Sequence, residues 1–490
     1  MTLKFEIYKN GERVRGFTPI DALAVGPESV PWTGQVAFKD DLLHVSRPED
    51  HATAVSLLWD IGQRGAYQME TTRLPPRAKP YILNVELARF RLMKIVQKQE
   101  DWNLFDFPKT EKLQSTFREA QGLFAQALAH LDKPDVAAKL ADRSIEVSFD
   151  LSEELAKFHA ELLLNRRRTT NSLPRHLFGA VVDWTVQSPL YREAVFELCD
   201  FVVLPMPWKT LQPSEDVFIS EQLDEWVEAL AKKRMLVIAG PLIDLTNDSV
   251  PDWLYIWEHD FDTLRDLAYD FVRKVVSRYR RAVTAWNVTS GLHAASNFSL
   301  SFEQMIDMTR LLVQQVRTIA PSSRSIVTVQ QPFGEYHARP NAAVPPMLYA
   351  DMVAQSGIQF DAFGLELTIG STQRGSLTRD LFQLSCMLDK FSTLGKPVFL
   401  TGVGAPDHAA PEAGRLRDGY SPQRQAKWLE EFSRIALSKP YIENICWSNF
   451  SDLSTKLPGG GLLDDSMQHK PIVGASQTLR ETLGRPTKKG

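Results

Sequence analysis

Short alternating runs of apolar and polar residues open the chain. The run LKFEIYK (3–9) is followed by Asn10 and Gly11 and then by ERVRGF (12–17). Period-two alternation on both sides of an Asn-Gly pair is typical of a β-hairpin with a two-residue turn. We therefore expect a small β-rich domain over residues 1–80.

The hydrophobic period then changes from two residues to three or four. The segment NVELARFRLMKIVQKQEDW (84–102) has helical spacing, and the apolar stripe continues at Leu113, Phe117, Leu123, Phe124, Leu128 and Leu131. This spacing predicts a region of long helices over residues 81–170. The run NRRRTTNSLPRH (165–176) mixes charged and polar residues with a proline, which is typical of a domain boundary and of a solvated helix end.

A third pattern, a short β-branched run followed by a helix-length amphipathic segment, recurs eight times after residue 170. The runs are HLFGAVVDW, CDFVVLPMPW, RMLVIAGPLI, AVTAWNVTS, SIVTVQQPF, FDAFGLELTI, KPVFLTGVGA and NICWSNFSD. Eight strand–helix units predict an α/β fold, a (β/α)8 TIM barrel over residues 171–490, with functional residues at the C-terminal strand ends. A doubly wound sheet is the main alternative, but it favours an early Gly-rich phosphate loop, which this sequence lacks.

Composition and charge narrow the function classes. The chain has 490 residues, of which 43% are hydrophobic and 24% charged, and its net charge is −4 at pH 7. This balance gives no reason to expect binding to nucleic acid or to an anionic membrane. The opening stretch (1–17) lacks the apolar core of a signal peptide, so we expect a cytoplasmic location.

The three cysteines are isolated from one another and from histidine pairs. Cys199, Cys386 and Cys446 lie in apolar or strand-like surroundings without C-x-x-C spacing. We interpret all three as core residues. We expect no disulfide, no bound metal and no other cofactor.

Several strand ends carry short motifs in a fixed order. PWKTLQP (207–213) follows the second predicted strand, and GPLIDLTNDSVPDWL (240–254) follows the third. CWSNFSDLST (446–455) and LLDDSMQHKPI (462–472) close the chain's last repeat. Together these segments resemble glycoside hydrolase family 10, the xylanase family, over about residues 175–480. The resemblance implies a TIM barrel and a site for an oligo- or polysaccharide.

The two catalytic glutamates of that family are missing at the matching positions. The fourth-strand pattern W-D-V-V-N-E corresponds to WNVTSG (286–291), which places the general acid/base at Gly291. The seventh-strand T-E corresponds to Thr401 and Gly402, which places the nucleophile at Gly402. A retaining glycosidase needs two carboxyls about 5–5.5 Å apart. The resemblance therefore implies that the family's own mechanism cannot operate here.

Other acids at strand ends are candidate replacements. Glu366 stands where the family has a glutamine that touches the nucleophile, so we expect its carboxylate beside Gly402. Period two along DAFGLELTIG (361–370) places Glu366 in the barrel lumen, where its pKa should be raised and Gln330 or Gln331 could donate to it. Asp244 could form a new carboxylate pair with Glu366. Asp183, after the first strand, is a further ligand-binding candidate.

Aromatic residues at strand ends are candidate sugar platforms. Flat rings stack on pyranose faces, and Trp208 and Trp447 lie where such platforms occur. Trp286, at the interior of its strand, is interpreted as a structural residue. His293 is interpreted as a loop residue.

Three functional hypotheses follow from these observations. The first is a catalytically inactive family-10-like barrel that binds carbohydrate or serves assembly, with residues 1–80 as a carbohydrate-binding module or docking surface. The second is an active glycosidase with a rebuilt carboxylate pair that includes Glu366. The third is a structural protein that self-associates through residues 84–168, in which case Pro205, Pro207 and Leu245 should fill the barrel mouth.

Overall fold

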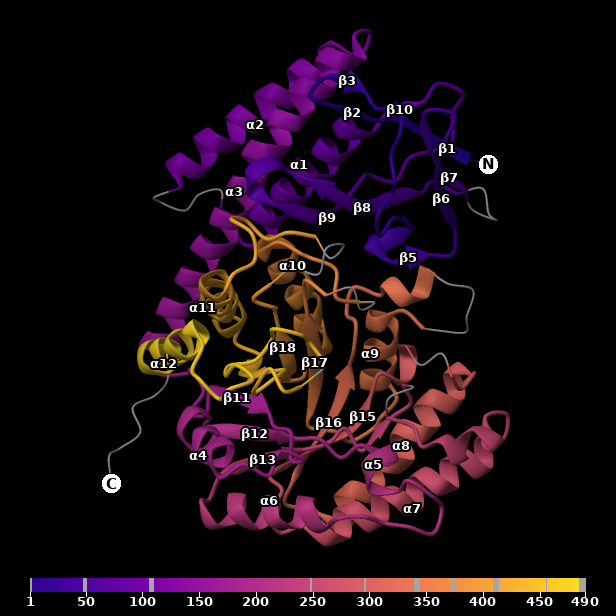
Figure 1. Cartoon of the computed structure of the whole chain (residues 1–490). Helices are drawn as coiled ribbons and strands as arrows, with labels where there is room; N and C mark the ends of the chain where they lie inside the picture. Colours follow the sequence, from indigo (N-terminus) through magenta and orange to yellow (C-terminus); the bar gives the residue numbers. More distant parts are fainter. Residues whose placement is uncertain are drawn as a thin grey trace.

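The computed structural model describes residues 2–46, 51–104, 110–246, 249–294, 297–338, 344–371, 375–408, 414–454 and 456–483 (Figure 1). Eight parallel strands form a closed barrel, which follows a β-rich region and a helical region along the chain. This confirms the predicted fold class. The barrel strands are β11 (Phe178–Val181), β12 (Phe201–Leu204), β13 (Leu236–Ala239), β15 (Ala285–Ser290), β16 (Arg324–Val329), β17 (Ala362–Thr368), β18 (Val398–Gly404) and β19 (Ile442–Trp447). Pairing of β13 with β15 closes the barrel, and the short β14 (Ile243–Asp244) adds to β15.

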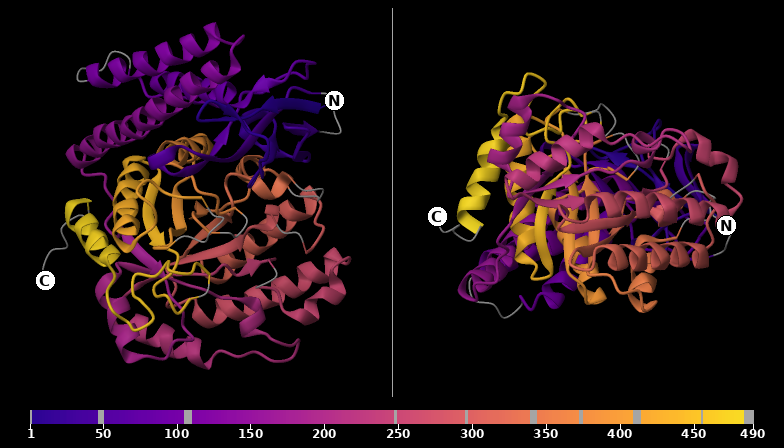
Figure 2. Two further views of the ribbon diagram at one scale, coloured as in Figure 1. Left: turned by 45° about the horizontal axis from the view of Figure 1, so that its top comes forward. Right: turned by 90° about the horizontal axis from the view of Figure 1, so that it is seen from below.

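Amphipathic helices cover the outside of the barrel (Figure 2). They are α4 (Pro189–Leu198), α6 (Glu221–Lys232), α7 (Phe261–Tyr279), α8 (Phe302–Ile319), α9 (Pro346–Gln355), α10 (Leu381–Phe391), α11 (Pro422–Ser438) and α12 (Pro471–Leu483). Local chemistry sets their starts: Ser301 and Gln304 form a capping box on α8, and Asp380 and Gln383 form one on α10.

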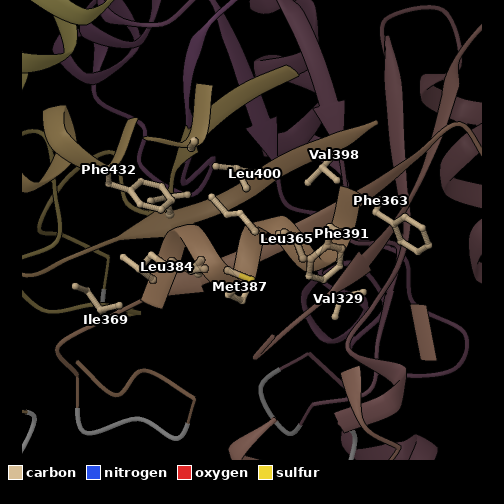
Figure 3. Close-up of a cluster of buried hydrophobic side chains, with 14 of the residues drawn as sticks. Val329, Phe363, Leu365, Ile369, Leu384, Met387, Phe391, Val398, Leu400 and Phe432 are labelled. Atoms are coloured by element: carbon tan, nitrogen blue, oxygen red, sulfur yellow. The ribbon is translucent and has the colours of Figure 1, made fainter. Parts of the chain in front are cut away.

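The side chains of β17 point alternately into the barrel lumen and outward to the helices. Phe363, Leu365 and Leu367 belong to the large core between the strands and the outer helices. Figure 3 shows Leu365 and Phe391 together between β17 and α10. Ala362 belongs instead to the separate cluster inside the barrel. Since neighbouring residues of a strand face opposite sides, the alternate set that begins with Ala362 and includes Glu366 faces the lumen.

The N-terminal region contains two four-stranded sheets, ordered β10-β1-β7-β6 and β5-β4-β8-β9, and one hairpin. The strands are β1 (Thr2–Glu6), β2 (Tyr8–Lys9), β3 (Glu12–Arg13), β4 (Leu23–Val25), β5 (Pro31–Trp32), β6 (Gln35–Lys39), β7 (Leu42–Ser46), β8 (Ala54–Asp60), β9 (Ala66–Glu70) and β10 (Tyr81–Ile82). The hairpin joins β2 to β3 through Asn10 and Gly11, whose φ angles are 53° and 81°. Positive φ at both central residues is what a type I′ turn requires, so the sequence prediction is confirmed here.

Three long helices connect this region to the barrel: α1 (Leu83–Asp101), α2 (Glu111–Ala129) and α3 (Pro134–Thr169). Helix α3 extends from the N-terminal region down the side of the barrel beside α11 (Figure 1). Lys157 and Arg434 form ion pairs between the two helices, with Glu431 and Glu161 respectively. Helix α3 therefore fixes the N-terminal region to the barrel. Within the described residues, no helix has both the length and the apolar character that crossing a membrane requires.

The C-terminal end of α3 corrects one sequence interpretation. Arg167 is buried, and its guanidinium donates to the backbone carbonyls of Leu437 at 2.7 Å, Lys439 at 2.9 Å and Ile442 at 3.3 Å. The run around it is therefore not simply a solvated helix end. The carbonyls of Leu437 and Lys439 lie at the C-terminal end of α11, and the carbonyl of Ile442 lies at the start of β19. Arg167 therefore holds the connection between this helix and this strand.

The N-terminal sheet borders the end of the barrel where the strands β16, β17 and β18 terminate. The Ala66 amide donates to the Arg415 carbonyl at 2.7 Å, and the Gln68 amide donates to the Thr378 carbonyl at 3.0 Å. A ring nitrogen of His337 lies 2.8 Å from the Pro31 carbonyl oxygen. All three barrel residues are in loops that follow strands, so the N-terminal region reaches the face that carries functional residues in TIM barrels.

Candidate functional site

Four polar side chains meet at the C-terminal ends of four neighbouring strands. Asp244 of β14 is the register partner of Ser290 of β15, Gln330 follows β16, and Glu366 lies near the end of β17. Ser290 Oγ donates to Glu366 Oε1 at 3.0 Å. Gln330 Nε2 is 2.9 Å from Ser290 Oγ and 3.3 Å from Asp244 Oδ2. We call these four residues the mouth network.

Both carboxyl groups of the mouth network are poorly solvated. Burial, and then the nearby charge of Asp244, raises the pKa of Glu366 above its ordinary value. Burial likewise raises the pKa of Asp244, against the hydrogen bonds from Thr246. Lys456 lowers both pKa values through its positive charge, although less than burial raises them. The charge of Asp244 disfavours ionisation of Glu366, and a carboxyl whose pKa is raised by burial and by a nearby acid is typical of a functional site.

The structure therefore bears out three expectations for Glu366. It faces the lumen, it accepts a side-chain hydrogen bond, and its pKa is raised. It also lies beside Gly402, which is its register partner on β18. A Cβ atom added to Gly402 would be 3.4 Å from Glu366 Cγ, which is an ordinary van der Waals contact. The glutamate side chain thus occupies the space next to this glycine.

Gly291 is closed to side chains for two reasons. Its φ angle is +66°, which residues with a Cβ atom rarely adopt. An added Cβ would also lie 2.5 Å from Gln330 Oε1, well inside van der Waals contact. Gln330 therefore occupies the space that a side chain at residue 291 would need.

The two tryptophans expected as sugar platforms are buried. Trp208, in the short helix α5 (Trp208–Leu211), is 2% exposed and stacks on Phe271 at a centroid distance of 4.9 Å. Trp447 is fully buried, and its indole NH donates to the Gly460 carbonyl. Neither ring has a free face for a sugar, so the expectation of platforms at these two positions is not met. Trp286 is also fully buried, as a structural residue should be.

Asp183 is not brought into the mouth network by any described contact. Its carboxylate accepts from the backbone amide of Thr185 at 3.0 Å and from the Thr185 hydroxyl at 2.6 Å. This is the geometry of a residue that stabilises its own turn. His293, interpreted from the sequence as a loop residue rather than a base, lies in a short 3-10 helix (Leu292–Ala294) between β15 and α8. It is buried against Tyr349, and burial lowers its pKa to about 4.

Sequence reasoning missed Lys456 as part of the site. The residue belongs to the loop after β19 and is exposed, yet its charge acts on both carboxyls of the mouth network. Its only sequence signal is a lysine just before the Pro-Gly-Gly-Gly stretch at 458–461. A lone lysine beside a glycine-rich stretch cannot be assigned to a site without the fold.

Comparisons with known proteins agree with the barrel geometry. No family model matches the chain. Over 294 residues the chain is 23% identical to endo-1,4-beta-xylanase B of Thermotoga neapolitana, a match that covers 56% of this chain and 78% of that protein. The GH10 structure from Paenibacillus barcinonensis has a TM-score of 0.50 at 16% identity, over 64% of this chain and 97% of that one. The structure of native xylanase 10B from Thermotoga maritima has a TM-score of 0.49 at 17% identity, over 63% of this chain and 95% of that one.

These likenesses define the class of the barrel. Its fold is that of the xylanase-like TIM barrels of glycoside hydrolase family 10. The activity named for the Thermotoga neapolitana relative belongs to that protein, and a shared fold does not by itself carry an activity.

Proposed function

We propose that this chain is a xylanase-like barrel that binds a carbohydrate at its mouth without cleaving it. The observation that carries the proposal is the mouth network, in which Ser290 and Gln330 connect the carboxyls of Glu366 and Asp244. By the strand-end motifs, the two catalytic glutamates correspond to Gly291 and Gly402. The side chains of Gln330 and Glu366 occupy the space next to those two glycines.

The chemistry of retaining hydrolysis supports this proposal. Double displacement needs one carboxylate to attack the anomeric carbon and a second carboxyl to protonate the leaving oxygen. An amide such as Gln330 can do neither, because it has no acidic proton to give and its oxygen is a weak nucleophile. The same groups suit binding, since amide, hydroxyl and carboxylate groups all hydrogen-bond to sugar hydroxyls. A β-1,4-linked xylooligosaccharide is the proposed ligand, by analogy with the relative's named activity.

Calorimetric titration with xylotetraose tests the binding half of the proposal. The wild-type chain should bind, and Glu366→Gln should weaken binding because it removes the charged acceptor at the centre of the network. Glu430→Gln, at an exposed position of α11, is the matched control and should bind normally. Absence of binding to the wild-type chain would reject carbohydrate recognition at the mouth.

A second function has one specific observation in its favour. The charge of Asp244 raises the pKa of Glu366 within a single network, as expected for the two acids of a rebuilt glycosidase. In that case aryl xylosides should be turned over steadily, and both Glu366→Gln and Asp244→Asn should abolish turnover. Activity that disappears on further purification, or that survives both substitutions, belongs to a contaminant and leaves the non-catalytic proposal in place.

A further inference from the structure

A cavity of about 300 Å³ lies where the N-terminal sheet meets the barrel. Its walls are formed by the sheet β5-β4-β8-β9, by α1 and by α10, three elements that the sequence separates widely. It shares no lining residue with the mouth network. The volume is at the lower end of the range for small-molecule sites, which often form between domains.

Positive side chains are numerous in these walls, and most already have partners. Three ion pairs use them: Arg91–Asp380, Lys98–Asp389 and Arg379–Glu335. Among the described residues, Lys94 and Lys390 have no ion pair. Lys94 Nζ donates to Gln97 Oε1 at 3.1 Å, and Lys390 Nζ donates to the Glu28 carbonyl at 3.1 Å. These two ammonium groups are the cations still available to a ligand.

The two lysines approach the cavity from different elements. Lys94 is on α1 and Lys390 is on α10, and both line the same space. Burial first, and the charge of Lys94 second, lowers the pKa of Lys390. Like charges that face one cavity create a positive potential there, and an anion relieves it.

Three acids line the cavity, Glu28, Glu70 and Asp389, and Asp389 is paired with Lys98 and Lys439. The other two do not cancel the positive potential. Glu70 of β9 accepts from Ser29 Oγ at 3.0 Å, and burial raises the pKa of Glu70 to about 7. A large share of Glu70 is therefore neutral near pH 7. The Glu70 and Glu28 charges attract Lys390, but burial and the repulsion from Lys94 outweigh them.

Apolar side chains line much of the rest of the cavity, beside polar groups such as Gln97 and Gln383. Phe90, Phe333, Phe382, Met69 and Met387 line it. Arg379 lies over the Phe333 ring at 4.4 Å, and Arg91 lies over Phe382 at 5.1 Å. Ion-paired guanidinium groups stacked on these rings limit their movement, so the apolar walls are preorganised.

We propose that this cavity binds an organic anion with an apolar body. The carboxylate or phosphate head lies between Lys94 and Lys390, and the body packs against the phenylalanine and methionine side chains. Neither the resemblance to xylanases nor the mouth network accounts for such a site. An occupied cavity would also join the N-terminal sheet to α10 of the barrel.

Calorimetry on the full chain with three matched probes tests this proposal. The probes are 4-phenylbutyrate, 4-phenylbutyl phosphate and the neutral 4-phenylbutanamide. The two anions should bind, and the amide should bind at least about tenfold more weakly because it lacks the charge. Whichever anion binds more tightly identifies the head group that the site prefers.

Lysine variants locate the binding. Lys94→Met and Lys390→Met should each weaken anion binding by about tenfold or more, while Lys427→Met, at an exposed position of α11, should leave it unchanged. Lys390→Arg keeps the charge and should retain most of the affinity. Equal binding of the amide and the carboxylate by the wild-type chain would overturn the proposal. So would binding insensitive to both lysines, or absence of binding by either anion.

Discussion

At the scale of single residues, the side chains that contact Gly291 and Gly402 define the barrel mouth. Glu366 fills the space beside Gly402, and Gln330 fills the space beside Gly291. These are two different situations, because only Gly291 has a positive φ angle that excludes larger residues. Introducing acids at the two positions should therefore have unequal consequences.

The double substitution Gly291→Glu with Gly402→Glu should not produce a working xylanase. At residue 291 the new Cβ would meet Gln330 Oε1 at 2.5 Å, and the left-handed backbone costs about 1–2 kcal/mol for a residue with a side chain. A misplaced catalytic group can lose about 100-fold in rate. Release of reducing sugar from xylooligosaccharides measures the outcome, with Gly402→Ala as the tolerated control. Turnover at ordinary enzyme rates would show that the strand-end motifs had been matched wrongly.

The raised pKa of Glu366 has a consequence for stability. Because the folded chain holds this proton more tightly than the unfolded chain does, ionisation destabilises the fold as pH rises above the ordinary pKa of 4.5. Glu366→Gln removes that penalty. The melting temperature should rise near pH 7 and should not change near pH 4. A variant that melts lower than the wild type near pH 7 would show that the charged carboxylate stabilises the fold.

Sequence alone placed Glu366 but not the tryptophans. The period of two in β17 decides which way Glu366 points, so its environment could be predicted from its neighbours in the chain. Trp208 and Trp447 also lie at strand ends, where platforms occur. Their burial depends on contacts with Phe271 and with the loop at Gly460, which are distant in sequence. Local pattern gives the direction of a side chain, whereas exposure depends on what the fold packs over it.

At the scale of elements, α3 is the part that joins the two halves of the molecule. It has 36 residues, and its ion pairs with the barrel are followed at its end by Arg167. The hydrophobic periods predicted the barrel strands and the long helices. The burial of Arg167 could not be predicted, because the carbonyls that accept its hydrogen bonds are about 270 residues further along the chain.

Arg167→Met should destabilise the chain by about 3 kcal/mol, because it removes several buried, charge-assisted hydrogen bonds to backbone carbonyls. Arg168→Met is the matched control. Arg168 is exposed and donates to Asn165 one turn earlier, so its loss should cost less than about 0.5 kcal/mol. Urea unfolding of both variants measures the difference. Equal effects would mean that the Arg167 contacts contribute little.

At the scale of the whole molecule, the N-terminal region completes the surface of the barrel. Asp380, at the start of α10, is fully buried and pairs with Arg91 of α1. Helix α3 covers α11, and β9 is hydrogen-bonded to the loops after β17 and β18. We propose residues 1–80, 81–170 and 171–490 as structural divisions that depend on one another for stability.

A chain of residues 171–490 alone should therefore be unstable. Removing α1 and α3 exposes the apolar faces of α10 and α11 and takes away the partner of Asp380. The melting temperature should fall by on the order of 10 °C or the cooperative transition should disappear. Calorimetric melting measures this. A truncated barrel that melts cooperatively at the temperature of the full chain would show that the barrel is independent.

We propose that the barrel mouth binds carbohydrate without hydrolysing it, and one NMR experiment tests both the binding and the absence of cleavage. Saturation-transfer difference spectra of xylohexaose with the purified chain report contact with the sugar, and the anomeric resonances in the same sample report cleavage. We predict transfer to the sugar that Glu366→Gln reduces, and anomeric signals that stay constant over prolonged incubation. New reducing-end signals that grow with protein concentration and vanish in Glu366→Gln would contradict the claim.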